Sequence, residues 1–372
     1  MRNAALLAVA VAFSAPAAAQ SVEVRPYGTM SSGEQVQEIV LKNRRGTTVR
    51  FISLGAIITA IEVPDRRGRR ENVALGFANL ADYQAKNKNY YFGGVVGRYA
   101  GRIGGARFTL DGREHRLEAN DGPNTLHGGS GPGWIGRNWS VEPLQDHRVA
   151  GATLHLTSPA GEQNFPGTMR ASVTYRLLND DSLRIDYAAT TNAPTHINLT
   201  NHSYFNLAGA GSGTVLDHRM QIPSDRVVET DERGIPTGRF LPVAGTPFDF
   251  RPPAALRQCV RVPRAEGTPP GCNHSWFYPA DDQLRLVGRL TEPRSCRVME
   301  VLTTEPSLHM YTANYMSGED RGAQGVPYRA LESVALETQH LPDTPNKPEF
   351  PSTALRPGEV FRSTTIYRFR VR

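Results

Sequence analysis

The chain has 372 residues and a formal net charge of +6, with 42 Lys or Arg against 36 Asp or Glu. Its basic residues are scattered, and the short run from Arg66 to Arg70 is typical of a solvated hairpin tip rather than a nucleic-acid surface. Beyond the first residues, no segment is long and apolar enough to cross a membrane. The sequence therefore predicts no nucleic-acid partner and no membrane-spanning domain.

The first residues have the pattern of an export signal. Met1-Arg2-Asn3 gives a short positive start, residues 4–15 are apolar, and Ala17-Ala18-Ala19 offers a small-residue cleavage site. A membrane anchor needs roughly 20 apolar residues, which is more than this run supplies. We therefore expect residues 1–19 to be a cleaved signal peptide, residues 20–372 to form the mature domain, and the protein to be periplasmic or secreted, without membrane association after cleavage.

Only three cysteines occur, namely Cys259, Cys272 and Cys296. Export would permit disulfides, and an odd count allows at most one pair and leaves one thiol over. Which of them pair, if any, stays open at this point. No Cys-x-x-Cys spacing is present, so the sequence gives no sign of a zinc or dithiol redox site.

The elements predicted along the chain are mostly strands. Alternating or β-branched runs predict strands over residues 48–52, 57–63, 107–110, 114–117, 152–157, 169–178, 182–191 and 364–371. Asp111-Gly112 and Asn179-Asp180-Asp181 are turn sequences that predict two hairpins. Residues 80–87 predict one short helix, residues 263–271 a loop that lines a site, and the last strand is expected to close a sheet. With 35 Gly and 27 Pro spread along the chain, the pattern favours one large antiparallel all-β domain.

Four stretches are rich in polar residues where strands should be apolar, and buried polar groups usually need a reason. These stretches are residues 97–103, 120–129, 195–209 and 336–343. In the third, strand alternation would place His196, Asn198, Thr200 and His202 on one face. Histidine titrates near neutrality, so this face is a good place for a proton donor. In the fourth, Glu337 precedes a Pro-rich segment and is a candidate base.

These stretches, in the same order, resemble the aldose 1-epimerase (galactose mutarotase) family over nearly the whole mature chain. The most specific segments are Thr-Asn-His-Ser-Tyr-Phe-Asn-Leu at residues 200–207 and Leu-Glu-Thr-Gln-His-Leu-Pro-Asp at residues 336–343. Residues 161–167 and 245–251 also match. The resemblance implies a single-domain β-supersandwich, which agrees with the all-β pattern. It also implies an isomerase that interconverts the α and β anomers of a free hexose or pentose.

The resemblance assigns roles to individual residues. His202 matches the family's general acid, which protonates the ring oxygen, and Glu337 matches the general base, which takes the proton of the anomeric hydroxyl. His127 matches a histidine that holds the substrate near the reacting centre. Arg102 matches the binding arginine of the family's Asn-Arg or Gly-Arg pair, here Gly101-Arg102. We expect His202 to start protonated and Glu337 to start ionised.

Two departures from the family pattern concern substrate binding. Asn273 stands where members commonly have an aspartate that binds sugar hydroxyls, and His309 stands where many have glutamine. Asn273 keeps the ability to accept and donate hydrogen bonds but brings no charge. Both changes concern binding and not the acid or the base. They therefore leave the identity of the sugar open and affect the predicted reaction less. We expect one or two aromatic side chains under the sugar, and the candidates are Trp134, Tyr204, Trp276 and Phe277, each with core packing as its default role.

Three other functions were weighed against this hypothesis. The main alternative is a non-catalytic sugar-binding module on the same scaffold, and the presence of His202, Glu337, His127 and Arg102 argues against it. A hexose-phosphate epimerase would need converging basic side chains, and a glycoside hydrolase would need two carboxylates. We expect a free monosaccharide as partner, a monomer or weak dimer, no cofactor and no metal, since His202, His274 and His309 lack a ligand spacing.

Overall fold

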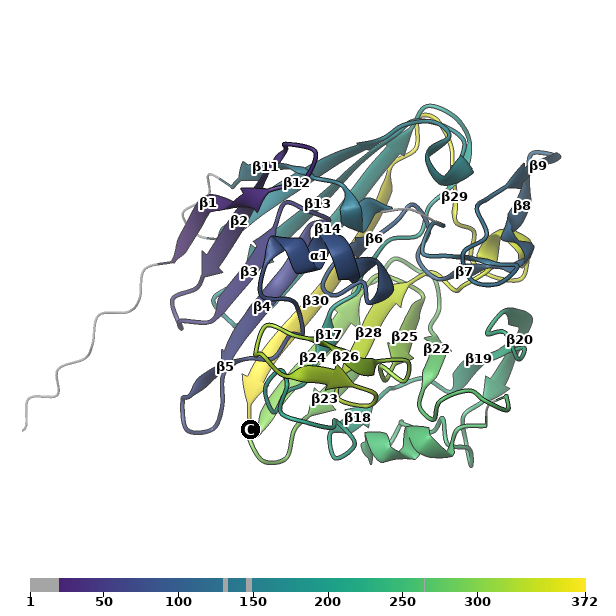
Figure 1. Cartoon of the computed structure of the whole chain (residues 1–372). Coiled ribbons are helices and arrows are strands. Elements are labelled where there is room, and N and C mark those ends of the chain that lie inside the picture. The colour runs from purple at the N-terminus through teal and green to yellow at the C-terminus, as the bar shows by residue number, and fades with distance from the viewer. Residues whose placement is uncertain (1–19, 130–132, 145–148, 264) are drawn as a thin grey trace, which may run out of the picture.

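The computed structural model describes residues 20–129, 133–144, 149–263 and 265–372 (Figure 1). The expected signal peptide at residues 1–19 lies outside the described residues. Within those ranges nearly all regular structure is β, and every ladder between named strands is antiparallel. None of the helices in these ranges has the length and apolar character that spanning a bilayer requires.

A nine-stranded sheet forms the back of the molecule (Figure 1). Its strands lie in the order β11 (Ser140–Pro143), β12 (Ala150–Ser158), β13 (Met169–Leu177), β14 (Ser182–Thr191), β30 (Phe361–Val371), β24 (Arg297–Thr303), β23 (Arg285–Thr291), β18 (Arg219–Gln221) and β21 (Ala254–Ala255). The predicted last strand is present, but it lies in the interior between β14 and β24 rather than at an edge. Ile366, Tyr367 and Phe369 are all buried there, so both faces of β30 are covered.

Two smaller sheets pack on this one. The five-stranded sheet runs β1 (Ser21–Thr29), β2 (Gln35–Lys42), β3 (Thr48–Ile52), β4 (Ile57–Pro64), β5 (Arg70–Asn72), and the six-stranded sheet runs β17 (Tyr204–Phe205), β28 (Val334–Gln339), β25 (Ser307–Tyr311), β22 (Asn273–Phe277), β19 (Arg226–Thr230), β20 (Pro236–Pro242). Phe51 of β3, Ile185 of β14 and Leu308 of β25 belong to one continuous buried core. Each such side chain contributes about 1.5–3 kcal/mol by leaving water.

Short elements complete the fold. Two-stranded ladders join β6 (Val95–Val96) to β16 (Thr200–Asn201), β7 (Arg102–Ile103) to β10 (Thr125–Leu126), β8 (Arg107–Leu110) to β9 (Arg113–Arg116), β15 (Thr195–His196) to β29 (Ala354–Leu355), and β26 (Ser317–Arg321) to β27 (Pro327–Arg329). The predicted helix is α1 (Leu80–Lys86), capped by Asn79, whose side chain accepts a hydrogen bond from the Asp82 N–H. Short 3₁₀ segments span Asn87–Asn89, Gly104–Ala106, Trp134–Gly136, Glu162–Asn164, Leu256–Arg261 and Thr344–Asn346. Both predicted hairpins are confirmed.

The structure shows which cysteines pair. Cys259 and Cys272 form a disulfide across a separation of 13 residues, with Cα atoms 4.9 Å apart, and Cys296 is free. Closing a loop of this length restricts the unfolded chain and stabilises the fold by about 3 kcal/mol in the chain-entropy model. The bridge joins the 3₁₀ segment Leu256–Arg261 to the residue just before β22.

Side chains in the six-stranded sheet alternate between an inner face, toward the nine-stranded sheet, and an outer face. Leu336 of β28 belongs to the buried core, and Thr338 makes a hydroxyl–hydroxyl hydrogen bond to Thr365 of β30, so these side chains face the nine-stranded sheet. Glu337 and Gln339 alternate with them and therefore point the other way. The outer face of this sheet is thus free to carry polar groups.

Candidate active site

A cavity of about 340 Å³ lies over the outer face of the six-stranded sheet. This volume is at the small end of the range for ligand sites, as suits a molecule of one sugar ring. The structure brings all six residues singled out from the sequence to its wall, namely Arg102, His127, His202, Asn273, His309 and Glu337. Four of them come from the four polar stretches, Asn273 comes from β22 and His309 comes from β25.

The strand register explains how Glu337 and its neighbours meet. His309 of β25 lies directly opposite Glu337 of β28, and Ser275 of β22 lies directly opposite His309. Residues opposite each other in an antiparallel ladder point to the same face. A polar row therefore crosses three strands, while Leu308 and Leu336 fill the core beneath it.

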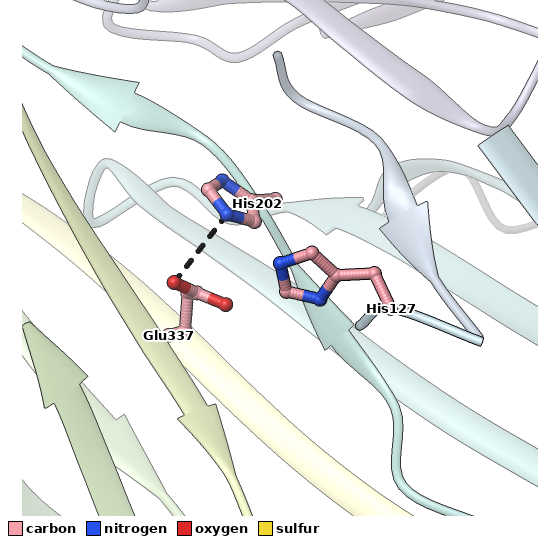
Figure 2. Close-up of side chains that lie close together, drawn as sticks. All are labelled: His127, His202 and Glu337. Carbon is pink, nitrogen blue, oxygen red and sulfur yellow. Dashed lines mark ion pairs between the residues drawn. The ribbon is translucent and has the colours of Figure 1, made fainter. Parts of the chain in front are cut away.

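His202 is held against this row by its own backbone. Its N–H donates to the Gly94 carbonyl at 2.9 Å, and its carbonyl accepts from the Gly93 N–H at 3.0 Å. The His202 Nε2 lies 3.5 Å from Glu337 Oε1, as Figure 2 shows, and both side chains are almost fully buried. Asn198 ties the two stretches together, because its side-chain amide donates to the His340 carbonyl and accepts from the His340 N–H.

Burial determines the resting protonation of this pair. It lowers the pKa of His202 to about 4, and it raises the pKa of Glu337 to about 8 against the opposing effect of Arg102. Both shifts favour the neutral forms in the free enzyme, which differs from the expected imidazolium and carboxylate. The neutral pair and the ion pair differ only in which residue holds one proton across the 3.5 Å gap. Between about pH 4 and about pH 8 the two residues therefore share one titratable proton.

His127 and Arg102 form the opposite wall. The backbone N–H of Gly101 donates to His127 Nδ1 at 3.2 Å, so the neutral ring carries its proton on Nε2. Burial and the nearby His202 and Arg102 lower the pKa of His127 well below its usual range, which keeps the ring neutral. Figure 2 shows the His127 ring beside His202 and Glu337. Arg102 Nε donates to Asp121 at 2.7 Å, which fixes the guanidinium at the rim.

Two expectations about the site are wrong. His196 does not share a face with His202: it is buried elsewhere, against Phe108 and the hydroxyl of Thr353. The backbone changes partner between the two histidines, since β15 pairs with β29 and β16 with β6, so period-two alternation does not hold across them. The described residues of the segment 263–271 do not line the cavity either.

The expectation about the aromatic residues is confirmed for one of them. Of the four candidates, only Tyr204 lines the cavity; Trp134 and Trp276 are fully buried in the core, and Phe277 packs on Phe240. The cavity instead has Tyr91, whose ring centroid lies 4.6 Å from that of His127, together with two tyrosines of the segment 311–315.

Arg98 shows why the first polar stretch contains two arginines. Its guanidinium is buried and donates to the carbonyls of Ser158, Pro159, Pro166 and Gly167. It therefore supports the turn at residues 161–167, whereas Arg102 lines the cavity.

Sequence reasoning did not identify several residues that line the cavity, including Tyr91, Asp121, Ser275, Tyr311 and Gln339. Asp121 stood inside a polar stretch already singled out, and a search for a carboxylate near Arg102 would have found it. Ser275 and Tyr311 carry no local signal, because their position follows from register with β25.

Within the described residues, one group of side chains has the spacing to hold a metal ion: ligand atoms of His127, His202 and Glu337 all lie within 4.8 Å of one another. The sequence predicted no metal. The same three side chains also suit proton transfer, which needs a donor and an acceptor within reach of one substrate.

An all-β sandwich with a histidine–carboxylate pair in a small cavity defines an acid–base catalyst for a small polar molecule. The sequence model of the family described as aldose 1-epimerase matches residues 37–368. Galactose mutarotase of Sus scrofa is 40% identical over 94% of this chain and 99% of its own length, and aldose 1-epimerase of Escherichia coli (strain K12) is 35% identical over 91% and 96%. The solved galactose 1-epimerase of Lactobacillus acidophilus NCFM superposes with a TM-score of 0.82 at 26% identity, over 95% and 99% of the two chains.

The chain belongs to the aldose 1-epimerase family. It is therefore an enzyme of the isomerase type, and the predicted single-domain, galactose mutarotase-like β-supersandwich is confirmed.

Proposed function

We propose that this enzyme interconverts the α and β anomers of a free aldose, such as galactose, glucose or a related hexose or pentose. The observation that carries the proposal is the 3.5 Å approach of His202 and Glu337 inside a cavity of monosaccharide size. The relatives named galactose mutarotase and aldose 1-epimerase support the same reaction.

The reaction needs one proton acceptor and one proton donor. The step starts with the shared proton on His202 and with Glu337 ionised. Glu337 takes the proton of the anomeric hydroxyl while His202 gives its proton to the ring oxygen, so the bond between the anomeric carbon and the ring oxygen breaks and an aldehyde forms. Rotation about the adjacent carbon–carbon bond presents the other aldehyde face. The ring closes as His202 regains its proton from the hydroxyl and Glu337 returns one to the carbonyl oxygen. The pair begins and ends with one proton, and each group supplies roughly 10²–10⁴-fold.

Polarimetry on freshly dissolved α-galactose, α-glucose and arabinose tests the function. We expect rotation to reach equilibrium faster with enzyme than in buffer for at least one of these sugars, with kcat/KM bell-shaped against pH. Below about pH 4 the pair gains a second proton and the base is lost; above about pH 8 it loses its only proton and the acid is lost. Binding of sugar without any acceleration would instead favour a non-catalytic sugar-binding module.

The same proposal places the enzyme in the periplasm or outside the cell. The positive start, the apolar run at residues 4–15 and the Ala17-Ala18-Ala19 site support export, and a disulfide between Cys259 and Cys272 suits an oxidising compartment. We expect the protein from a periplasmic or medium fraction to have an intact mass that begins near Gln20. A variant with Ala17 and Ala19 changed to Glu should keep the precursor mass. Full-length protein confined to the cytosol would contradict export.

A further inference from the structure

Three side chains from the neighbouring strands β22 and β25 are linked by hydrogen bonds along the cavity wall. The hydroxyl of Ser275 lies 2.8 Å from His309 Nδ1, and His309 Nε2 lies 2.8 Å from the carbonyl oxygen of Asn273. All three residues line the cavity. These hydrogen bonds therefore link Ser275 through His309 to Asn273.

The direction of these hydrogen bonds follows from the charge of His309. Burial, with His274 and Arg102 nearby, lowers the pKa of His309 to about 3, so its ring is neutral and has one N–H. Asn273 places its carbonyl oxygen against Nε2, so Nε2–H is the donor, and Nδ1 accepts from the Ser275 hydroxyl. The Asn273 oxygen is thereby occupied. Its amide nitrogen has no hydrogen-bond partner among the described side chains and remains available to a ligand.

The cavity that Asn273 lines contains several hydrogen-bond donors and little negative charge. His127 offers Nε2–H, and Arg102 uses Nε for Asp121 while its terminal nitrogens make no hydrogen bond to a described residue. Of the two carboxyl groups on the wall, Asp121 is paired with Arg102, and Glu337 is held near neutrality by burial. The cavity thus presents N–H groups, which suit oxygens that only accept hydrogen bonds.

We infer that the cavity admits aldoses that carry a carboxylate, namely hexuronic acids, with the Asn273 amide donating to the acid group. A hexuronic acid keeps the pyranose ring and the anomeric centre of a neutral hexose, so the His202–Glu337 pair acts on it unchanged. An aspartate at position 273 would repel the anion, whereas the asparagine, oriented by His309, attracts it. This inference rests on the proposed function, since it names a substrate class for the same site.

The test compares galacturonate with galactose by proton NMR measurement of anomer exchange at pH 7. We expect the wild-type enzyme to accept galacturonate with a kcat/KM at least one-third of that for galactose. Asn273→Asp should lower the galacturonate-to-galactose ratio of kcat/KM at least tenfold. Because His309 can become protonated beside a new carboxylate, the double variant Asn273→Asp/His309→Gln removes that compensation and should lower the ratio further.

A surface substitution of the same kind gives the matched control. Asn179 lies in the β13–β14 turn, where its side chain contacts the Arg44 N–H and Gln20, and Asn179→Asp should leave the ratio unchanged. Wild-type enzyme that acts on galactose but gives less than one-tenth of that kcat/KM with galacturonate would overturn the inference while the proposed function stands. Equal losses for both sugars in both Asn273 variants would also overturn it. No acceleration with either sugar would count against the proposed function itself.

Discussion

Replacing Glu337 with glutamine should lower kcat for mutarotation about 10²–10⁴-fold, with a much smaller change in KM. Glutamine keeps the shape and the place of the side chain on β28, but its amide cannot take the anomeric proton. We expect the substrate to keep its other contacts, for which His127 and Arg102 on the cavity wall are the candidates. Initial rates from polarimetry, corrected for the buffer reaction, measure kcat and KM separately.

Glu292 provides the matched control for this variant. It is also a buried carboxylate, but it lies outside the cavity and accepts hydrogen bonds from the backbone N–H groups of Arg294 and Ser295. Glu292→Gln should lower the melting temperature and keep kcat near the wild-type value. A Glu337→Gln enzyme that is folded and retains more than a tenth of the wild-type kcat would show that another group is the base.

The sequence predicted the strands that have one apolar and one solvated or half-buried face. Residues 182–191 show this alternation and match β14 to the residue, and the β-branched run 48–52 matches β3 to the residue. It did not predict β22 or β25, because the outer faces of these strands carry the polar residues of the cavity. Both strands belong to the six-stranded sheet that supports the site. Their partners in that sheet are far away in the sequence, so a local pattern does not reveal the pairing.

Sequence motifs predicted which residues belong to the candidate site. They did not predict how those residues are arranged in space. The likeness to a family assigned His202 and Glu337, which the fold then places 3.5 Å apart. Alternation alone grouped His196 with His202 and was wrong, because the chain changes sheets between them. The link from Asn273 to His309 joins residues 36 positions apart and depends on the register of β22 with β25. Such a contact has no signature in a single sequence.

Replacing His202 with asparagine should lower kcat by a similar factor, about 10²–10⁴-fold, because asparagine cannot deliver a proton to the ring oxygen. The two variants differ in how their residual activity depends on pH. His202→Asn leaves Glu337, which acts only when ionised, so its residual rate should rise as pH increases through about 8. Glu337→Gln leaves His202, which acts only when protonated, so its residual rate should fall as pH increases through about 4.

His218 gives the matched control for the histidine variant. It is buried outside the cavity, and its Nε2 accepts a hydrogen bond from the Leu207 N–H. His218→Asn should reduce thermal stability, because an unsatisfied buried N–H costs about 1–3 kcal/mol, and it should leave kcat and the bell-shaped profile in place. Residual rates that change with pH in the same direction in His202→Asn and Glu337→Gln would contradict the assignment of one residue as acid and the other as base. Opposite directions arise only if the two groups carry out complementary proton transfers on one substrate.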